Sequence, residues 1–225
     1  MPQKPLQLTP AVEDYVKAVY TLETEEEGAT TTALAERLGV QPGSVSGMVH
    51  KLVKLGLARH QPYYGVELTP AGRRVALEVI RHHRLLELYL VESLGMSWDE
   101  VHDEAEVLEH VLSEDLEELI AAKLGHPTTD PHGDPIPTAE LRLARDDSRR
   151  LYDLAPGDTG TFVRVSDADP AMLRFLAERG IVPGTQLRVV ERQPFDGPLT
   201  VKLNGGQEVL GAVLARAMRV REDKG

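Results

Sequence analysis

A short acidic stretch, HDEAEVLEH, contains the residues of this sequence that are best suited to bind a cation. His102, Glu106, Glu109 and His110 stand in it at positions i, i+4, i+7 and i+8. On a helix those steps lie along one face, so two imidazoles and two carboxylates project from one strip. A cation coordinated by nitrogen and oxygen needs such ligands gathered from neighbouring helices. The spacing therefore predicts a site for a divalent metal ion.

A second pair of the same type, His83 and Glu87, stands upstream at i and i+4. The alternative is a solvated acidic face, because a histidine four residues from a glutamate is often only a salt link. Two observations favour the metal. The segment from Gly95 to Ile120 holds ten acids and no Lys or Arg, which costs repulsion unless a cation is present. The second His/Glu pair lies on what reads as the preceding helix.

The bulk composition is that of an ordinary globular protein, with 225 residues, 41% hydrophobic and 27% charged. No apolar run approaches the length of a membrane span, and MPQKPLQLTPAVEDY lacks the pattern of a secretory signal. The absence of cysteine excludes disulfides and thiolate metal sites. We expect a cytoplasmic protein with no membrane partner.

The net charge of −11 argues at first against DNA as a partner, but the charge is uneven. From Arg37 to Arg74 there are six bases against one acid, Glu67. Phosphate recognition needs a local basic face rather than a basic protein. The asymmetry predicts one region for DNA and another for cations.

The basic region has the pattern of a winged helix-turn-helix. Helical spacing covers residues 10–26, then 31–40 with Thr31 or Thr32 as cap and a stop at Gly39, then 41–58. Two short strands at 57–60 and 66–68 follow as a hairpin. Small residues near the start of the third helix allow approach to base edges, while lysines further along contact phosphate. The predicted DNA-binding residues are Gln41, Pro42, Ser44, Ser46, Gly47, Lys51 and Lys54.

Two long helices are expected next, one from Thr69 to Leu94 and one from Ser97 to about Leu124. Both carry a broad apolar stripe that a winged domain of this size cannot cover. We therefore expect a second copy of the chain to cover it, and a homodimer also suits a two-fold DNA site.

The C-terminal third changes to short strands separated by Gly/Pro turns, which is typical of a small barrel. Strands are expected at 160–165, 186–192, 199–203, 207–211 and 217–220, with one helix at 170–179. The predicted organisation is α+β. Residues 1–73 form the winged domain, 74–140 a helical metal-binding and dimerisation domain, 141–151 a linker, and 152–225 the barrel.

The sequence resembles the diphtheria toxin repressor family, and more closely its manganese transport regulator branch. The resemblance rests on AVEDYVKAVYTLE, LAERLGVQPGSVSGMVHKL, LTPAGRRVA, RHHRLLELYL, VHDEAEVLEHVLSED and HGDPIP, and it covers all three regions. It implies an SH3-like (FeoA-like) barrel and metal-dependent binding to operator DNA that controls metal-uptake genes. It also implies a principal metal site from Asp14, Glu106, Glu109 and His110, and a second site from His83, Glu87 and His102.

The same resemblance bears on the choice of metal. Iron-type members have Met and Cys where this sequence has Asp14 and Glu106, and hard carboxylates suit Mn²⁺. We expect Mn²⁺, with Fe²⁺ as the alternative. Two departures are visible. Lys17 stands where the manganese branch has a further carboxylate ligand, and a barrel ligand has no clear match, although Asp167 or Asp169 could serve.

Two other classes of function are alternatives. A metallohydrolase also uses His and Glu on helices, but no HExxH motif, GxSxG elbow or P-loop is present, and we expect no enzyme. A DNA-binding module that senses no metal is separated from a metal-dependent regulator by a chelator-reversible gel shift.

Overall fold

The computed structural model describes residues 8–24, 28–61, 65–203 and 205–223. It divides into two compact units, each assembled from separate stretches of chain. The first unit contains residues 1–83, 109–112 and 137–142, and the second contains 84–108, 113–136 and 143–225. The segment 109–112 therefore returns to the first unit from the middle of the chain.

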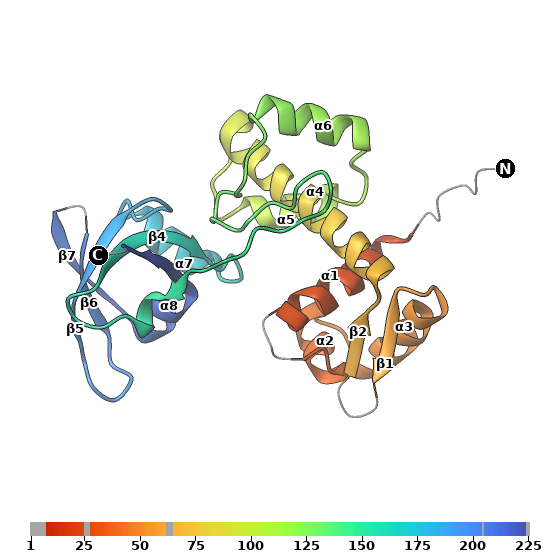
Figure 1. Ribbon diagram of the computed structural model, residues 1–225, viewed down its shortest axis with the longest axis horizontal. Helices are drawn as coiled ribbons and strands as arrows, with labels where there is room; N and C mark the ends of the chain where they lie inside the picture. The colour runs from red at the N-terminus through yellow and green to blue at the C-terminus, as the bar shows by residue number, and fades with distance from the viewer. Residues whose placement is uncertain (1–7, 25–27, 62–64, 204, 224–225) are drawn as a thin grey trace. The chain divides into compact units, whose positions relative to one another are not determined.

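The N-terminal part of the first unit is a winged helix-turn-helix (Figure 1). Helices α1 (Pro10–Thr24), α2 (Thr31–Leu38) and α3 (Pro42–Lys54) precede the antiparallel hairpin β1 (Ala58–Gln61) and β2 (Gly65–Leu68). Its core is made of aliphatic side chains from all five elements, including Val16, Leu34, Leu52, Ala58 and Val66. The predicted order of elements is confirmed, while residues 25–27 and 62–64 lie outside the described part.

The turn between α2 and α3 depends on Gly39, which ends α2 in the left-handed region with φ 63°. A glycine adopts that conformation without the steric cost of a Cβ. At the other end of α2 the side chain of Thr30 accepts a hydrogen bond from the backbone N–H of Ala33. The predicted stop is correct. The predicted cap at Thr31 or Thr32 is wrong by one or two residues, because three consecutive threonines offer equivalent hydroxyls.

Helix α4 (Pro70–Leu94) is confirmed as one continuous element, and the side chain of Thr69 accepts from Gly72 N at its start. The single helix expected from Ser97 to about Leu124 is wrong. The chain forms α5 (Val101–Leu108) and α6 (Glu114–Lys123), separated by residues 109–113. Ser113 has extended backbone, and its hydroxyl accepts from Leu116 N, so it begins a new helix rather than continuing the first.

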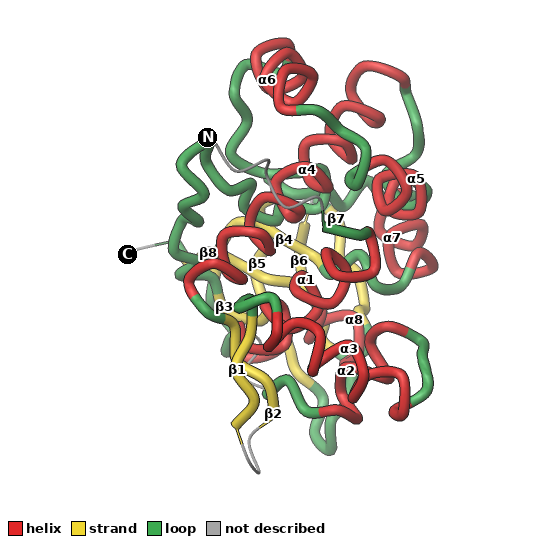
Figure 2. The backbone as a smooth tube through the Cα atoms, turned by 90° about the vertical axis from the view of Figure 1, so that its right-hand side faces the viewer, coloured by secondary structure: helices red, strands yellow, loops and turns green. Residues whose placement is uncertain are grey.

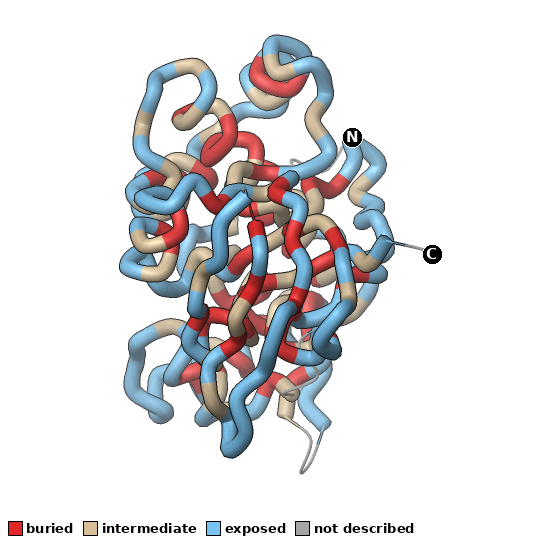
Figure 3. The backbone as a smooth tube through the Cα atoms, turned by 90° about the vertical axis from the view of Figure 1, so that its left-hand side faces the viewer, coloured by how far each residue is buried: buried red, intermediate tan, exposed pale blue. Residues whose placement is uncertain are grey.

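The C-terminal part of the second unit is a six-stranded antiparallel sheet in the order β3-β8-β4-β5-β6-β7 (Figure 2). The strands are β3 (Arg149–Arg150), β4 (Thr159–Val165), β5 (Gln186–Arg192), β6 (Leu199–Leu203), β7 (Gly206–Leu210) and β8 (Met218–Glu222). Buried positions alternate with less buried ones along β6. Figure 3 shows buried stretches next to exposed ones along the backbone. Helix α7 (Pro170–Ala177) packs Leu173 and Leu176 into the same core.

Three small elements of this part escaped prediction: β3, the 3₁₀ turn η1 (Leu151–Asp153) and helix α8 (Ala212–Ala217). Residues 149–150 read as the end of a polar tract, yet they pair with Val220 and Arg219 of β8. The six residues of α8 are too few to show a period, so a short apolar run does not distinguish helix from strand.

A proline-rich loop after α6 is attached to strand β4 within the second unit. The backbone N–H of Val165 donates to the carbonyl of His132 at 3.0 Å. Gly133 next to it has φ 91°, and a Cβ there would meet the carbonyl oxygen of Val163 at 1.8 Å. Only glycine allows this approach, and it fixes the neighbouring side chains of the loop.

None of the described helices is both long enough and apolar enough to cross a membrane.

Candidate functional site

Four side chains meet in the first unit, where residues 109–110 contact helix α1. Nε2 of His110 lies 2.9 Å from Oδ1 of Asp14, and its Nδ1 lies 2.7 Å from Oε2 of Glu13. Oε1 of Glu109 lies 3.8 Å from Nε2 of His110. We call Glu13, Asp14, Glu109 and His110 the first cluster. It joins a helix of the winged domain to a segment that follows α5.

Glu109 is the most enclosed member of the first cluster, with a side chain that is 0% exposed. Both of its oxygens lie 2.9 Å from Nζ of Lys17, one turn along α1 from Asp14. Its Oε2 also lies 2.5 Å from Nδ1 of His83, and Nζ of Lys17 lies 3.3 Å from the same nitrogen. A buried carboxylate requires such partners, because desolvation of an unpaired charge is costly.

The donor set of the first cluster fits a divalent cation. Asp14, Glu109 and His110 each offer one ligand atom within 4.8 Å of the others. For an octahedral ion with bonds of about 2.1 Å, neighbouring ligands lie roughly 3 Å apart and opposite ones roughly 4.2 Å apart. The distances of 2.9 and 3.8 Å around Nε2 of His110 fall in that range. Two carboxylates and one imidazole make a hard, oxygen-rich site.

A second group of the same chemistry lies within the second unit. Nδ1 of His102 on α5 lies 3.5 Å from Oε1 of Glu87 on α4 and 3.0 Å from Oδ2 of Asp167, just after β4. Hydrogen bonds to Asp167 and then to Glu87 raise the pKa of His102 to about 10, although burial acts in the opposite direction. Burial acts to raise the pKa of Asp167, but its hydrogen bond with His102 leaves it lowered.

Two buried residues of the proline-rich loop extend this group. Nδ1 of His132 lies 3.7 Å from Oε2 of Glu87, and its Nε2 lies 2.7 Å from the carbonyl oxygen of Trp98. Burial acts to lower the pKa of His132, but the Glu87 carboxylate raises it to about 9. Burial, then the nearby carboxylates of Asp134 and Glu87, raise the pKa of Asp130 to about 8. The raised pKa values of His102, His132 and Asp130 favour the protonated forms of these groups.

The donors of this second group also fit a cation. Glu87, Asp130 and His132 are all buried, and one ligand atom of each lies within 4.8 Å of the others. Buried acids packed this closely need either protons or a metal to offset their repulsion. We call Glu87, His102, Asp130, His132 and Asp167 the second cluster.

The predicted ligands are thus distributed between two clusters. The structure brings Asp14, Glu109 and His110 together, and it brings Glu87 and His102 together. Glu106 lies on α5 in the second unit, 3.7 Å from His102, and His83 contacts Glu109 in the first. Of the two barrel candidates, Asp167 contacts His102, whereas Asp169 caps α7 by accepting from Ala171 N.

Sequence reasoning missed Asp130 and His132. A signal was present, because DPHGD places two acids and a histidine in a loop otherwise rich in Pro and Gly. Pro and Gly mark this loop as a boundary between elements, and no periodicity connects it to the helices. Only the seating of Gly133 on β4 shows that these side chains turn inward.

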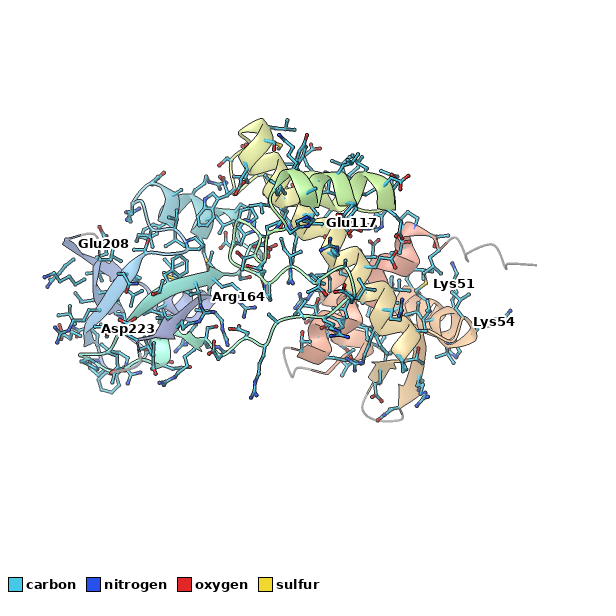
Figure 4. All side chains as sticks on the ribbon, turned by 45° about the horizontal axis from the view of Figure 1, so that its top comes forward. Lys51, Lys54, Glu117, Arg164, Glu208 and Asp223 are labelled. Atoms are coloured by element: carbon cyan, nitrogen blue, oxygen red, sulfur yellow. The ribbon has the colours of Figure 1, made fainter. Side chains whose placement is uncertain are left out.

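The predicted DNA-binding residues share the solvent-facing side of α3. Gln41, Pro42, Ser44, Ser46, Gly47, Lys51 and Lys54 are all exposed, whereas Val45, Val49 and Leu52 face the core. Lys51 and Lys54 extend outward from the helix (Figure 4). Small side chains at its start and two ammonium groups in its last turn suit entry into a major groove.

Comparisons with known proteins agree with this arrangement. Residues 7–66 match the model of the iron dependent repressor N-terminal DNA binding domain. Residues 69–138 match the iron dependent repressor metal binding and dimerisation domain, and residues 149–222 match the FeoA domain. The iron-dependent repressor IdeR of Mycobacterium tuberculosis is 35% identical over 231 residues, covering 96% of this chain and 99% of that protein.

The chain belongs to the diphtheria toxin repressor family. The diphtheria toxin repressor of Corynebacterium efficiens is 33% identical over 228 residues, which is 97% of this chain and 98% of the relative. A solved structure titled as a manganese-dependent transcriptional repressor in complex with manganese is 45% identical, with a TM-score of 0.89. The match covers 94% of this chain and 99% of the chain in that structure.

Membership confirms the predicted fold and class of function: a metal-dependent, DNA-binding transcriptional regulator with a helix-turn-helix domain, a helical dimerisation domain and an SH3-like FeoA domain. Both iron-dependent and manganese-dependent repressors are among the similar proteins, so the family does not fix the metal.

Proposed function

We propose that this diphtheria toxin repressor family member is a homodimeric, manganese-responsive regulator that binds operator DNA and controls metal-uptake genes. One observation carries the proposal: the first cluster takes ligands both from α1 of the DNA-binding domain and from residues 109–110, beyond α5. A cation held there is shared by the DNA-binding domain and the segment that connects to the dimerisation helices.

The residues of the first cluster couple the binding of metal to the binding of DNA. When bound, a divalent cation supplies positive charge that the carboxylates of Asp14 and Glu109 and the imidazole of His110 can share. Asp14 then holds α1 against residues 109–110, which selects a narrower set of positions for the DNA-binding helix α3. Because such coupling is reciprocal, operator DNA should tighten metal binding.

Manganese is supported by ligand hardness and by one of the comparisons. The principal site is proposed to comprise Asp14, Glu106, Glu109 and His110, which offer three carboxylates and one imidazole and no sulfur. Mn²⁺ favours hard oxygen ligands, whereas sulfur ligands favour softer metals. The solved relative at 45% identity is a manganese-dependent repressor in complex with manganese, and the iron-dependent relatives are 35–36% identical to this chain. Fe²⁺ remains the alternative.

The second cluster is proposed as a further metal site, and its Glu87 and His102 are two of the three ligands that the resemblance implies, the third being His83. The geometry adds Asp130 and His132 as candidate ligands, and it favours Asp167 over Asp169 as the ligand from the barrel. Its protonated histidines must lose protons before they can coordinate a metal, so metal uptake should release protons.

The dimer is supported by apolar side chains that the described part of a single chain leaves exposed. Leu94, Val107, Leu116 and Leu119 on helices α4 to α6 are each at least 48% exposed. They fall within the residues that match the dimerisation domain. Replacing Leu119 with Glu should shift the protein toward monomer in sedimentation, whereas Leu143→Glu, outside these helices, should leave the association unchanged.

Operator affinity measured against free Mn²⁺, Fe²⁺ and chelator tests the proposal. We expect binding with Mn²⁺ that chelator reverses, and loss of that response in Asp14→Asn with the fold intact by circular dichroism. Operator binding that ignores chelator would instead support a DNA-binding module without metal sensing.

A further inference from the structure

We propose that the ammonium group of Lys17 is a built-in cation that stabilises the metal-free first cluster and limits it to one divalent ion. The inference rests on the proposed function. Its geometric basis is that Nζ of Lys17 lies 2.9 Å from each oxygen of Glu109. The same nitrogen lies 3.3 Å from Nδ1 of His83, so the ammonium occupies the position of a cation between an imidazole and a carboxylate.

Burial makes this ammonium necessary in the metal-free protein. The Glu109 side chain is fully buried, and the Lys17 side chain is 19% exposed. Removing one member of a buried ion pair leaves the other charge uncompensated, which destabilises the fold more than the pair stabilises it. Lys17 therefore supplies a positive charge beside the buried carboxylate of Glu109 and holds it in place before any metal arrives.

Charge balance favours one ion. The three carboxylates of the first cluster and Glu106, the further ligand proposed for this site, carry four negative charges, which two divalent ions would balance. The Lys17 ammonium cancels one of the four. A second divalent ion would therefore leave the site with a net positive charge in a partly buried place, where repulsion between like charges is strong.

The side of Glu109 that faces Lys17 and His83 is also occupied. Carboxylates bridge two metals by giving one oxygen to each, with the metals about 3.5–4 Å apart. Here Oε2 of Glu109 already lies 2.5 Å from His83 and 2.9 Å from Lys17, while Oε1 is the oxygen nearer His110. One ion can bind on the His110 side of Glu109 while Lys17 keeps its contact with Oε2.

The test is the number of Mn²⁺ ions bound per full-length chain, measured by loss of the free Mn²⁺ resonance and by calorimetry. Lys17→Glu exchanges the ammonium for a carboxylate and so adds two negative charges, the charge of one further divalent ion, so it should bind one more Mn²⁺ than wild type. Lys17→Arg should bind the wild-type number. Lys123→Glu on α6 makes the same change in net charge elsewhere and should also leave the number unchanged.

Lys17→Gln provides a second readout, in case four acids prevent Lys17→Glu from folding without metal. This variant should lower the melting temperature of the metal-free protein by about 5 °C. Mn²⁺ should then raise the melting temperature of the variant by more than it raises that of wild type. Unchanged ion number in folded Lys17→Glu, or unchanged metal-free stability in Lys17→Gln, overturns the inference. If Asp14→Asn fails to remove one Mn²⁺ from wild type, the proposed metal site itself is wrong.

Discussion

The ring of Trp98 stacks on the ring of His132, with centroids 5.7 Å apart and planes 22° apart. The carbonyl oxygen of Trp98 lies 2.7 Å from Nε2 of the same histidine, which leaves Nδ1 facing Glu87. Trp98 is the single tryptophan of the sequence. Its fluorescence therefore reports on the second cluster.

Adding Mn²⁺ should quench this fluorescence. A paramagnetic ion bound at Nδ1 of His132 would be separated from the indole of Trp98 only by the imidazole ring that stacks on it. His132→Gln should abolish the high-affinity part of the quenching, measured by titration of metal-free protein. Asp14→Asn is the matched control, and it should retain the signal while losing Mn²⁺-dependent operator binding. Quenching that persists in His132→Gln but disappears in Asp14→Asn would assign the signal to the first cluster instead.

Lys51 and Lys54 should act through phosphate charge. Replacing either with Ala should weaken binding to specific and non-specific DNA alike, and the salt slope should fall by roughly 0.9 for each phosphate that the lysine neutralises. Changing Ser44, near the start of α3, should alter the preference among bases instead. Affinity measured at several salt concentrations on two operators separates the effects. An unaltered slope in Lys51→Ala would mean that α3 docks differently.

Metal preference should change with ligand hardness. Asp14→Met combined with Glu106→Cys should move activation of operator binding toward Fe²⁺ or Co²⁺ and away from Mn²⁺. Wild type should respond to Mn²⁺ at least as strongly as to Fe²⁺, with the iron measurements made anaerobically. If Fe²⁺ but not Mn²⁺ raises the operator affinity of the wild-type protein, the argument from ligand hardness is contradicted, although the family assignment would stand.

The buried carboxyl of Asp130 should make metal-free stability depend on pH. Its pKa is raised to about 8 in the fold, so its stabilising contribution is complete below about pH 4 and is lost as pH rises toward 8. Asp130→Asn removes this proton, while its side-chain oxygen can still accept from His132 N and Asp134 N.

Between pH 5.5 and pH 8 the free energy of unfolding of the Asn variant should therefore rise relative to that of wild type by about 3 kcal/mol, at roughly 1.4 kcal/mol per pH unit for one proton. Denaturant titration of chelator-treated protein at both pH values measures this difference. Asp147→Asn, at an exposed aspartate, should show no such gain. An equal difference at both pH values would mean that Asp130 stays ionised throughout.

The elements that follow strong local rules were predictable. Helix α4 begins at Pro70, directly after the capping residue Thr69, and β5 and β6 lie between clear turn signals. The break between α5 and α6 was not predicted, because the apolar period continues through residues 109–113 and only the cap at Ser113 marks the interruption.

The candidate site was predictable where its ligands share a helix or a recognised motif. Glu109 and His110 lie in one such motif, and Glu87 lies four residues after His83. Two contacts of the site join distant parts of the chain. Lys17 contacts both oxygens of Glu109, and Asp130 lies close to Glu87. Spacing along a sequence contains no information about them, since tertiary packing alone determines which faces meet.

The contacts of the first cluster join positions far apart in the chain, with 92 residues from Lys17 to Glu109 and 97 from Glu13 to His110. The winged core, by contrast, closes entirely within the first 76 residues. During synthesis the DNA-binding head can therefore fold while the chain that carries Glu109 is still inside the ribosome. A nascent or truncated chain that ends before residue 109 contains the DNA-binding domain but lacks Glu109 and His110 of the first cluster. Sensitivity to metal is therefore acquired late in folding.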